Sequence, residues 1–163
     1  MSRRTAALAA IIAGANLASA STNVDPTGVW EVVDYTATDP ATGAVQHPFG
    51  ANPIGAAVYT AKGHMSVFVS GSHRMASTGT GDTRARERAD LLDSMYAYTG
   101  TFSVKGSAMT VHVQSAWQPD WVGTEKIRTL KIDHDVLTVT TPPMTSPVDG
   151  KTYISMTSFR RAE

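Results

Sequence analysis

Residues 96–141, YAYTGTFSVKGSAMTVHVQSAWQPDWVGTEKIRTLKIDHDVLTVTT, decide the fold of this chain. Four runs in this stretch alternate apolar and polar residues, are rich in β-branched side chains and end in turn residues: 96–104, 108–116, 124–132 and 135–141. Two of the connections between them are tight, KGSA at 105–108 and DHD at 133–135. Strands that follow one another through such short loops pair as antiparallel neighbours. The stretch therefore predicts consecutive antiparallel hairpins.

Four further runs with the same strand character lie outside this stretch, at 28–37, 55–60, 63–70 and 151–160. An open sheet of eight short strands would expose two edges, and closing it into an up-and-down barrel removes both. Sequential hairpins favour this barrel over the competing sandwich or jelly roll. We therefore predict an all-β fold, an eight-stranded antiparallel up-and-down barrel with one inserted helix. Its interior would be just wide enough for side chains or one small ligand.

The inserted helix is predicted at residues 81–95, GDTRARERADLLDSM, which break the strand pattern. Ala85, Ala89, Leu92 and Met95 recur at spacings of three and four, as on one face of a helix. Asp82 is the expected N-cap. A loop rich in glycine and serine precedes the helix, and loops at barrel mouths often control access. We expect residues 82–95 to act as a lid.

The composition bounds the class of protein. The 163 residues suggest a single domain, and 14 basic residues balance 14 acidic ones, so the chain lacks the basic footprint of a nucleic-acid partner. The absence of cysteine excludes disulfides, thiolate chemistry and a lipid anchor on cysteine. The histidines are too scattered for the ligand spacing of a metal site. We therefore expect no metal, no cofactor, no nucleic-acid partner and no membrane anchor. The sequence makes no prediction of oligomeric state.

The N-terminus has the three parts of a secretory signal peptide. MSRR is a basic segment, TAALAAIIAGANL is an apolar run too short to span a bilayer, and Ala18, Ser19 and Ala20 form a small-residue cleavage pattern. We predict a signal peptide over residues 1–20 and a barrel domain over 21–163. The mature protein would then be periplasmic or secreted. The competing interpretation of residues 1–20 is a genuine N-terminal helix.

The bend QSAWQPDWVG connects two of the predicted strands. Pro119 and Asp120 are turn formers, and Gly123 can adopt a positive φ. Trp117 and Trp121 flank the bend. Two interpretations compete: the indoles plug the end of the barrel as core, or they line its mouth and stack on a flat ligand. Both place the bend at one end of a cavity.

Several longer segments resemble the bacterial and fungal lipocalin-like domain family. They are GVWEVVDY with its Gly-x-Trp opening, NPIGAAVYTAKGHMSV, YAYTGTFSV and the run from Val111 to Thr141, and the resemblance covers about residues 27–160. It implies an eight-stranded calycin-type barrel, with Trp30 pointing inward and Arg160 packed on it. Some family members are found near natural-product biosynthesis genes. Gln114 and Trp117 depart from the family pattern, which has an acidic residue and a less bulky one there.

Strand alternation sorts the candidate site residues into faces. Asp34 shares a face with Trp30, and Arg128 shares one with Leu130 and Ile132, so both are expected inside. On 108–116 the apolar face alone would put His112 outside, whereas the resemblance favours His112 inside. An apolar cavity with a few converging polar groups is the usual small-molecule site. The candidate ligand-binding residues are Tyr59, Tyr98, His112, Gln114, Trp117, Trp121 and Arg128.

These residues support two functions. The first is a secreted or periplasmic lipocalin-like protein that binds a small, mostly apolar molecule, hydrophobic or aromatic, in its barrel. The alternative is a cyclase or isomerase acting on a polyketide- or polyene-like intermediate, with His112 as acid/base and Arg128 as oxyanion stabiliser. A structural or envelope-stress protein without a ligand is a third class. The absence of a Gly-x-Ser-x-Gly elbow argues against a serine hydrolase.

Overall fold

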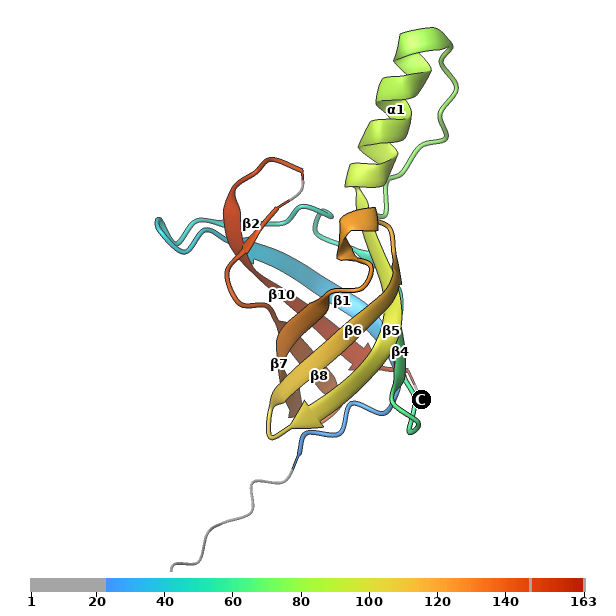
Figure 1. Ribbon diagram of the computed structural model, residues 1–163. Coiled ribbons are helices and arrows are strands. Elements are labelled where there is room, and N and C mark those ends of the chain that lie inside the picture. The colour runs from blue at the N-terminus through green and yellow to red at the C-terminus, as the bar shows by residue number, and fades with distance from the viewer. Residues whose placement is uncertain (1–22, 147, 163) are drawn as a thin grey trace, which may run out of the picture.

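The structure, a computed structural model, describes residues 23–146 and 148–162 (Figure 1). Within these residues, eight long strands match the eight predicted runs to within about two residues at each end. They are β1 (Gly28–Thr38), β3 (Ile54–Tyr59), β4 (His64–Ser70), β5 (Met95–Lys105), β6 (Ala108–Ala116), β7 (Glu125–Asp133), β8 (Val136–Thr140) and β10 (Thr152–Arg161). The remaining elements are the two-residue strands β2 (Val45–Gln46) and β9 (Met144–Thr145), the helix α1 (Gly81–Asp93) and the 3₁₀ turn η1 (Pro119–Trp121).

The long strands close into the predicted barrel. Each pairs antiparallel with the next, in the order β1-β3-β4-β5-β6-β7-β8-β10, and β1 also pairs with β10. The ring of strands is visible in Figure 1. The short strands β2 and β9 extend the sheet beside β1 and β10. The all-β up-and-down barrel is therefore confirmed. The predicted signal peptide, residues 1–20, lies outside the described residues.

Trp30 closes one end of the barrel. Its side chain is fully buried, and its indole Nε1 donates a 2.7 Å hydrogen bond to the carbonyl of Pro26. The guanidinium carbon of Arg161 lies 4.0 Å from the centre of the Trp30 ring, and Arg161 Nη1 donates to the carbonyl of Thr27. The expectation that Arg160 packs on Trp30 is wrong. Phe159 faces the core, so strand alternation turns Arg160 outward and Arg161 back inward.

A β-bulge in β1 changes which residues face inward. The pairing of β1 with β10 shifts between Val32 and Asp34, so one extra residue is inserted on β1. Asp34, expected on the inner face, instead has a half-exposed carboxylate 3.4 Å from Nδ1 of His47. Tyr35 then lines the barrel interior. The bulge thus exchanges an acidic residue for a phenol inside the barrel.

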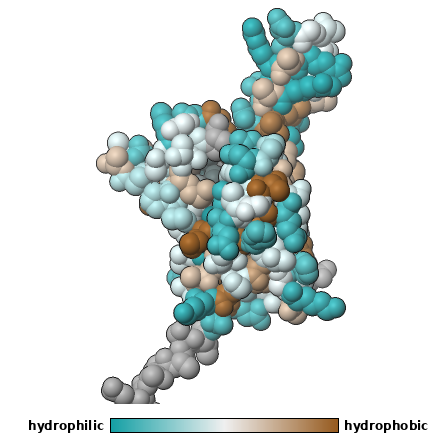
Figure 2. All heavy atoms as spheres, viewed as in Figure 1, coloured by the Kyte–Doolittle hydropathy of each residue, from teal (hydrophilic) through white to brown (hydrophobic). Residues whose placement is uncertain are grey.

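The helix α1 stands away from the barrel rather than covering it (Figure 1). None of its residues is buried, and mostly hydrophilic side chains cover it (Figure 2). The predicted helix is confirmed, but the N-cap is Thr80, and Asp82 lies in the first turn. Arg74 ties the preceding loop to the helix end by donating to the carbonyl of Leu91 and the hydroxyl of Ser94. The described residues include no helix long and apolar enough to cross a bilayer.

Candidate functional site

A cavity of about 290 Å³ lies at the end of the barrel opposite Trp30. It is surrounded by the last part of β1, the beginnings of β5 and β10, η1 and the segment around β9. From the residues predicted as a lid, only Asp93 and Met95 line it, so α1 does not cover the cavity in this arrangement. Aromatic side chains dominate the wall: Tyr35, Phe49, Tyr96, Tyr98, Trp117, Trp121 and Tyr153.

The aromatic rings form a connected wall. The ring centres of Tyr35 and Phe49 are 4.6 Å apart, and Tyr96 lies 5.8 Å from each of them. Tyr98 meets Trp121 edge-on at 5.8 Å, and Trp121 meets Trp117 edge-on at 6.4 Å. Such tilted and edge-on pairs are favourable and hold each ring in place. Both tryptophans of the bend line the cavity, at the end of the barrel where both interpretations of the bend placed it.

Local hydrogen bonds fix the bend that carries the two indoles. The backbone N–H of Trp117 donates to the carbonyl of Ala97 at 2.8 Å, and this hydrogen bond anchors the bend to β5. The Gly123 N–H donates to the carbonyl of Val113 at 2.9 Å, and Gly123 has a φ of 79° that favours glycine. Lys126 packs on this bend, and its Nζ lies over the Trp121 ring, 4.6 Å from the ring centre. These backbone hydrogen bonds fix the bend and thereby the positions of the two indoles.

Arg128 is the buried charge of the site. It projects from the inner face of β7 between two neighbours of the same face, Lys126 and Leu130, and is only 4 % exposed. Its Nη1 donates to the carbonyl of Ile127 at 2.8 Å and contacts Sδ of Met144 at 3.7 Å. Within residues 23–146 and 148–162, no carboxylate oxygen lies within 4.0 Å of the guanidinium.

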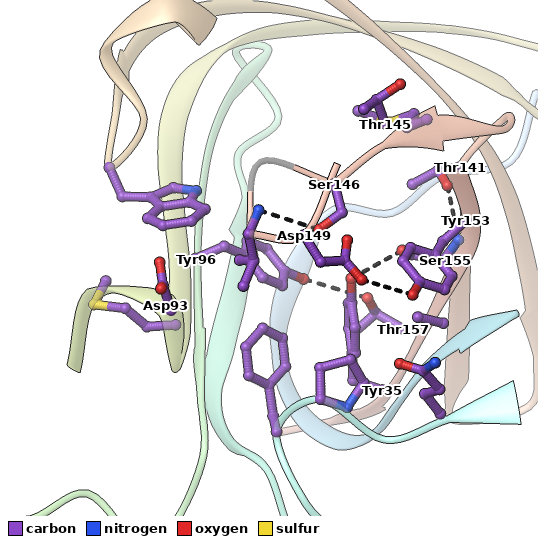
Figure 3. A pocket seen from close by; sticks show the side chains of 18 of the residues that line it. Tyr35, Asp93, Tyr96, Thr141, Thr145, Ser146, Asp149, Tyr153, Ser155 and Thr157 are labelled. Atoms are coloured by element: carbon purple, nitrogen blue, oxygen red, sulfur yellow. Dashed lines mark hydrogen bonds between the residues drawn. The ribbon is translucent and has the colours of Figure 1, made fainter. Parts of the chain in front are cut away.

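Hydroxyl pairs line the rest of the cavity (Figure 3). The Tyr35 hydroxyl donates to Oγ of Ser155 at 2.9 Å, and the hydroxyls of Tyr96 and Thr157 are 3.3 Å apart. Burial raises the pKa of Tyr35 and, more strongly, that of Tyr96. Both phenols therefore stay protonated at neutral pH, and neither acts as a base.

At the rim, the Tyr153 hydroxyl donates to Oδ2 of Asp149 at 2.8 Å (Figure 3). This hydrogen bond and one from the Lys151 N–H lower the pKa of Asp149. The same carboxylate raises the pKa of Tyr153. The pair fastens the hairpin that follows β9 to β10, and this hairpin forms one side of the cavity mouth.

The structure brings together four of the seven predicted ligand-binding residues: Tyr98, Trp117, Trp121 and Arg128 all line the cavity. Tyr59 is buried in the core, edge-on to Phe102 at 5.3 Å, and does not line the cavity. Burial raises its pKa strongly. His112 and Gln114 are exposed on the outer face of β6, so the expectation that they face the interior is wrong.

The outward position of His112 has a simple cause. Met109, Val111 and Val113 alternate with it on β6, and all three are fully buried, because only one face of a strand can be inside the barrel. Sequence reasoning also missed cavity residues. Tyr96 shares a strand face with Tyr98, and that period of two could have identified it. Tyr35 could not be identified in this way, since the bulge in β1 has no clear sequence signal.

A family comparison agrees with this geometry. The sequence model described as a lipocalin-like domain matches residues 27–161. The chain belongs to the lipocalin-like domain family. No curated protein and no solved structure shows significant similarity to it. A lipocalin-like barrel with a concave, largely aromatic cavity suggests small-molecule binding. In the described part of this lipocalin-like chain, no three His, Asp or Glu side chains cluster as metal ligands would.

Proposed function

We propose that this protein is a carrier that binds one small, mostly apolar molecule, hydrophobic or aromatic, in the barrel cavity. The observation that carries the proposal is the cavity itself, whose wall joins aromatic side chains to polar ones at the open end of the barrel. Its volume of about 290 Å³ is near the lower limit of ligand sites, which favours a compact ligand.

The place of action is part of the same proposal. The basic, apolar and small-residue segments of residues 1–20 support export of the protein, and a carrier outside the cytoplasm would meet its ligand in the periplasm or the medium. These residues lie outside the described part of the chain.

The alternative function, a cyclase or isomerase of natural-product biosynthesis, required His112 as the acid/base. A general acid or base must reach the proton that it transfers, and His112 lies on the outer face of β6. Arg128 alone could stabilise an oxyanion but could not move a proton at neutral pH. Binding is therefore the better supported role.

Fluorescence titration with N-phenyl-1-naphthylamine, a neutral aromatic probe, tests the binding role. We expect saturable binding of one probe, and Trp121→Ala should weaken it by about three- to tenfold, the value of a lost aromatic contact. Ile127→Ala, on the exposed outer face of β7, is the matched control and should change nothing. Native mass spectrometry of protein purified from its own host should also reveal a bound small molecule.

The proposal fails if the probe does not bind, no small molecule co-purifies, and calorimetry with other small aromatic compounds gives no heat of binding. It also fails if Trp121→Ala and Ile127→Ala lower the affinity equally, because the probe would then sit outside the cavity.

A further inference from the structure

We propose that the ligand carries a carboxylate on a flat apolar frame, and that Arg128 holds this carboxylate inside the barrel. This inference rests on the proposed binding function and specifies its ligand class.

The first support is the uncompensated charge of Arg128. A buried guanidinium is costly unless it is paired and hydrogen-bonded. Arg128 is 4 % exposed, yet only its Nη1 has acceptors among the described residues, a neighbouring carbonyl and a thioether sulfur. Nε and Nη2 have none there. A carboxylate matches the two-donor fork of a guanidinium, so an anionic ligand would supply the missing partner.

The second support is a neighbouring cation. Lys126 lies two residues before Arg128 on the same face of β7. Burial lowers the pKa of Lys126, and the positive charge of Arg128 lowers it further. Lys126 does not line the cavity, but its charge and that of Arg128 disfavour each other, so an anion bound at Arg128 would relieve both.

The third support is that neither acidic group of the cavity wall pairs with Arg128. The Asp149 carboxylate accepts hydrogen bonds from Tyr153 and from the Lys151 N–H. Asp93, the other acid in the wall, lies at the end of α1. Neither has an oxygen within 4.0 Å of the Arg128 guanidinium. The described cavity wall thus holds no carboxylate in contact with Arg128.

The shape of the wall determines the rest of the ligand. Trp121 meets both Tyr98 and Trp117 edge-on, and all three side chains line the cavity, so the wall offers aromatic surface to a planar group. A single carboxylate on a bicyclic aromatic frame fits both the polar end and this wall.

A matched pair of competitors tests the proposal in the unmodified protein. With N-phenyl-1-naphthylamine as the reporter at neutral pH, 2-naphthoate and methyl 2-naphthoate are compared as displacers. They share one frame and differ in the charge of the head group. We expect 2-naphthoate to displace the reporter at a concentration about tenfold lower or more, as expected for a charge-assisted hydrogen bond.

Variants then assign the effect to Arg128. Arg128→Gln should abolish the preference for 2-naphthoate over its ester, because the charged contact is lost. Arg128→Lys should give an intermediate preference, since lysine cannot offer the two-donor fork. Lys131→Gln removes a charge from the exposed outer face of the same strand and should have no effect.

Each outcome is decisive. Equal displacement by acid and ester in the unmodified protein overturns the carboxylate inference and leaves the binding function standing. A preference for the acid that survives in Arg128→Gln overturns the role of Arg128. If Arg128→Gln does not fold, the Lys variant and the unmodified protein decide. If calorimetry detects binding of neither the reporter nor the two naphthalenes, both proposals fall.

Discussion

Trp30 illustrates how one side chain can close a barrel. Its indole fills the end of the barrel, satisfies its polar atom on the Pro26 carbonyl, and is covered by the Arg161 guanidinium. A buried indole contributes a large apolar area, and its N–H must find an acceptor. The Gly-x-Trp opening identified this residue from the sequence. The sequence did not identify its cationic partner, because two adjacent arginines point to opposite faces of β10.

Replacement of the two arginines separates their roles. Arg161→Met should lower the free energy of unfolding by about 1–2 kcal/mol, through loss of the cation–π contact and of the hydrogen bond to Thr27. Arg160→Met, at the exposed neighbouring position, should change it by less than about 0.5 kcal/mol. Chemical denaturation of both variants measures the difference. Equal effects would mean that Arg161 does not cover Trp30.

Alternation places the decisive residues on both β6 and β7. The apolar side chains of β6 face the core and turn His112 outward, a position that alternation left undecided and that the family resemblance predicted wrongly. On β7, Arg128 faces inward because Leu130 shares its face and is buried. The inner position of Arg128 was therefore predictable from period-two alternation, whereas the lack of a carboxylate near it required the folded neighbours.

The β9–β10 hairpin is the element that shapes the mouth of the cavity. A backbone hydrogen bond from the Ser146 N–H to the Lys151 carbonyl holds it, and so does the side-chain hydrogen bond from the Tyr153 hydroxyl to Asp149. The Asp149 carboxyl has a lowered pKa, so its contribution is fully present above the ordinary value of 3.8 and is lost as pH falls through the lower folded pKa. The hairpin should therefore loosen only in acid, below about pH 4.

The amide of Lys151 reports this titration, because it donates to Oδ1 of Asp149. In NMR titrations we expect its chemical shift to change with a midpoint below 3.8. Tyr153→Phe removes the largest cause of the shift and should move the midpoint up toward 3.8. The amide of Thr27 donates to Asp25 at the closed end of the barrel, and its titration midpoint should be the same in Tyr153→Phe as in the unmodified protein. An unchanged midpoint for Lys151 in Tyr153→Phe would contradict the pairing.

The molecule as a whole is a barrel with one sealed end and one open end. Trp30 and Arg161 seal the first, and the bend with η1, the β9–β10 hairpin and the end of α1 surround the second (Figure 1). Closure leaves no long sheet edge exposed, which suits a protein that has no disulfide to stabilise it. We propose that this barrel is exported with residues 1–20 removed.

N-terminal sequencing tests the export proposal. The mature protein, recovered from the periplasm or the medium, should begin at Ser21, because small residues at Ala18 and Ala20 are what the signal peptidase requires. Ala20→Arg should block cleavage and retain the precursor, whereas Ser19→Gln, at the tolerant middle position, should be processed normally. A cytoplasmic protein that keeps residues 1–20 would refute the proposal.

The sequence by itself determined the number, order and pairing of the eight long strands, because alternation with period two and tight turns are local properties of the chain. It also indicated that Arg128 faces inward and that the bend with its two tryptophans lies at one end of a cavity. Only the tertiary structure decided that Tyr35 replaces Asp34 inside, that α1 leaves the cavity uncovered, and that Arg161 rather than Arg160 covers Trp30. A bulge shifts the register of everything after it, and charge compensation depends on strands that are distant in sequence, so neither can be read from local pattern.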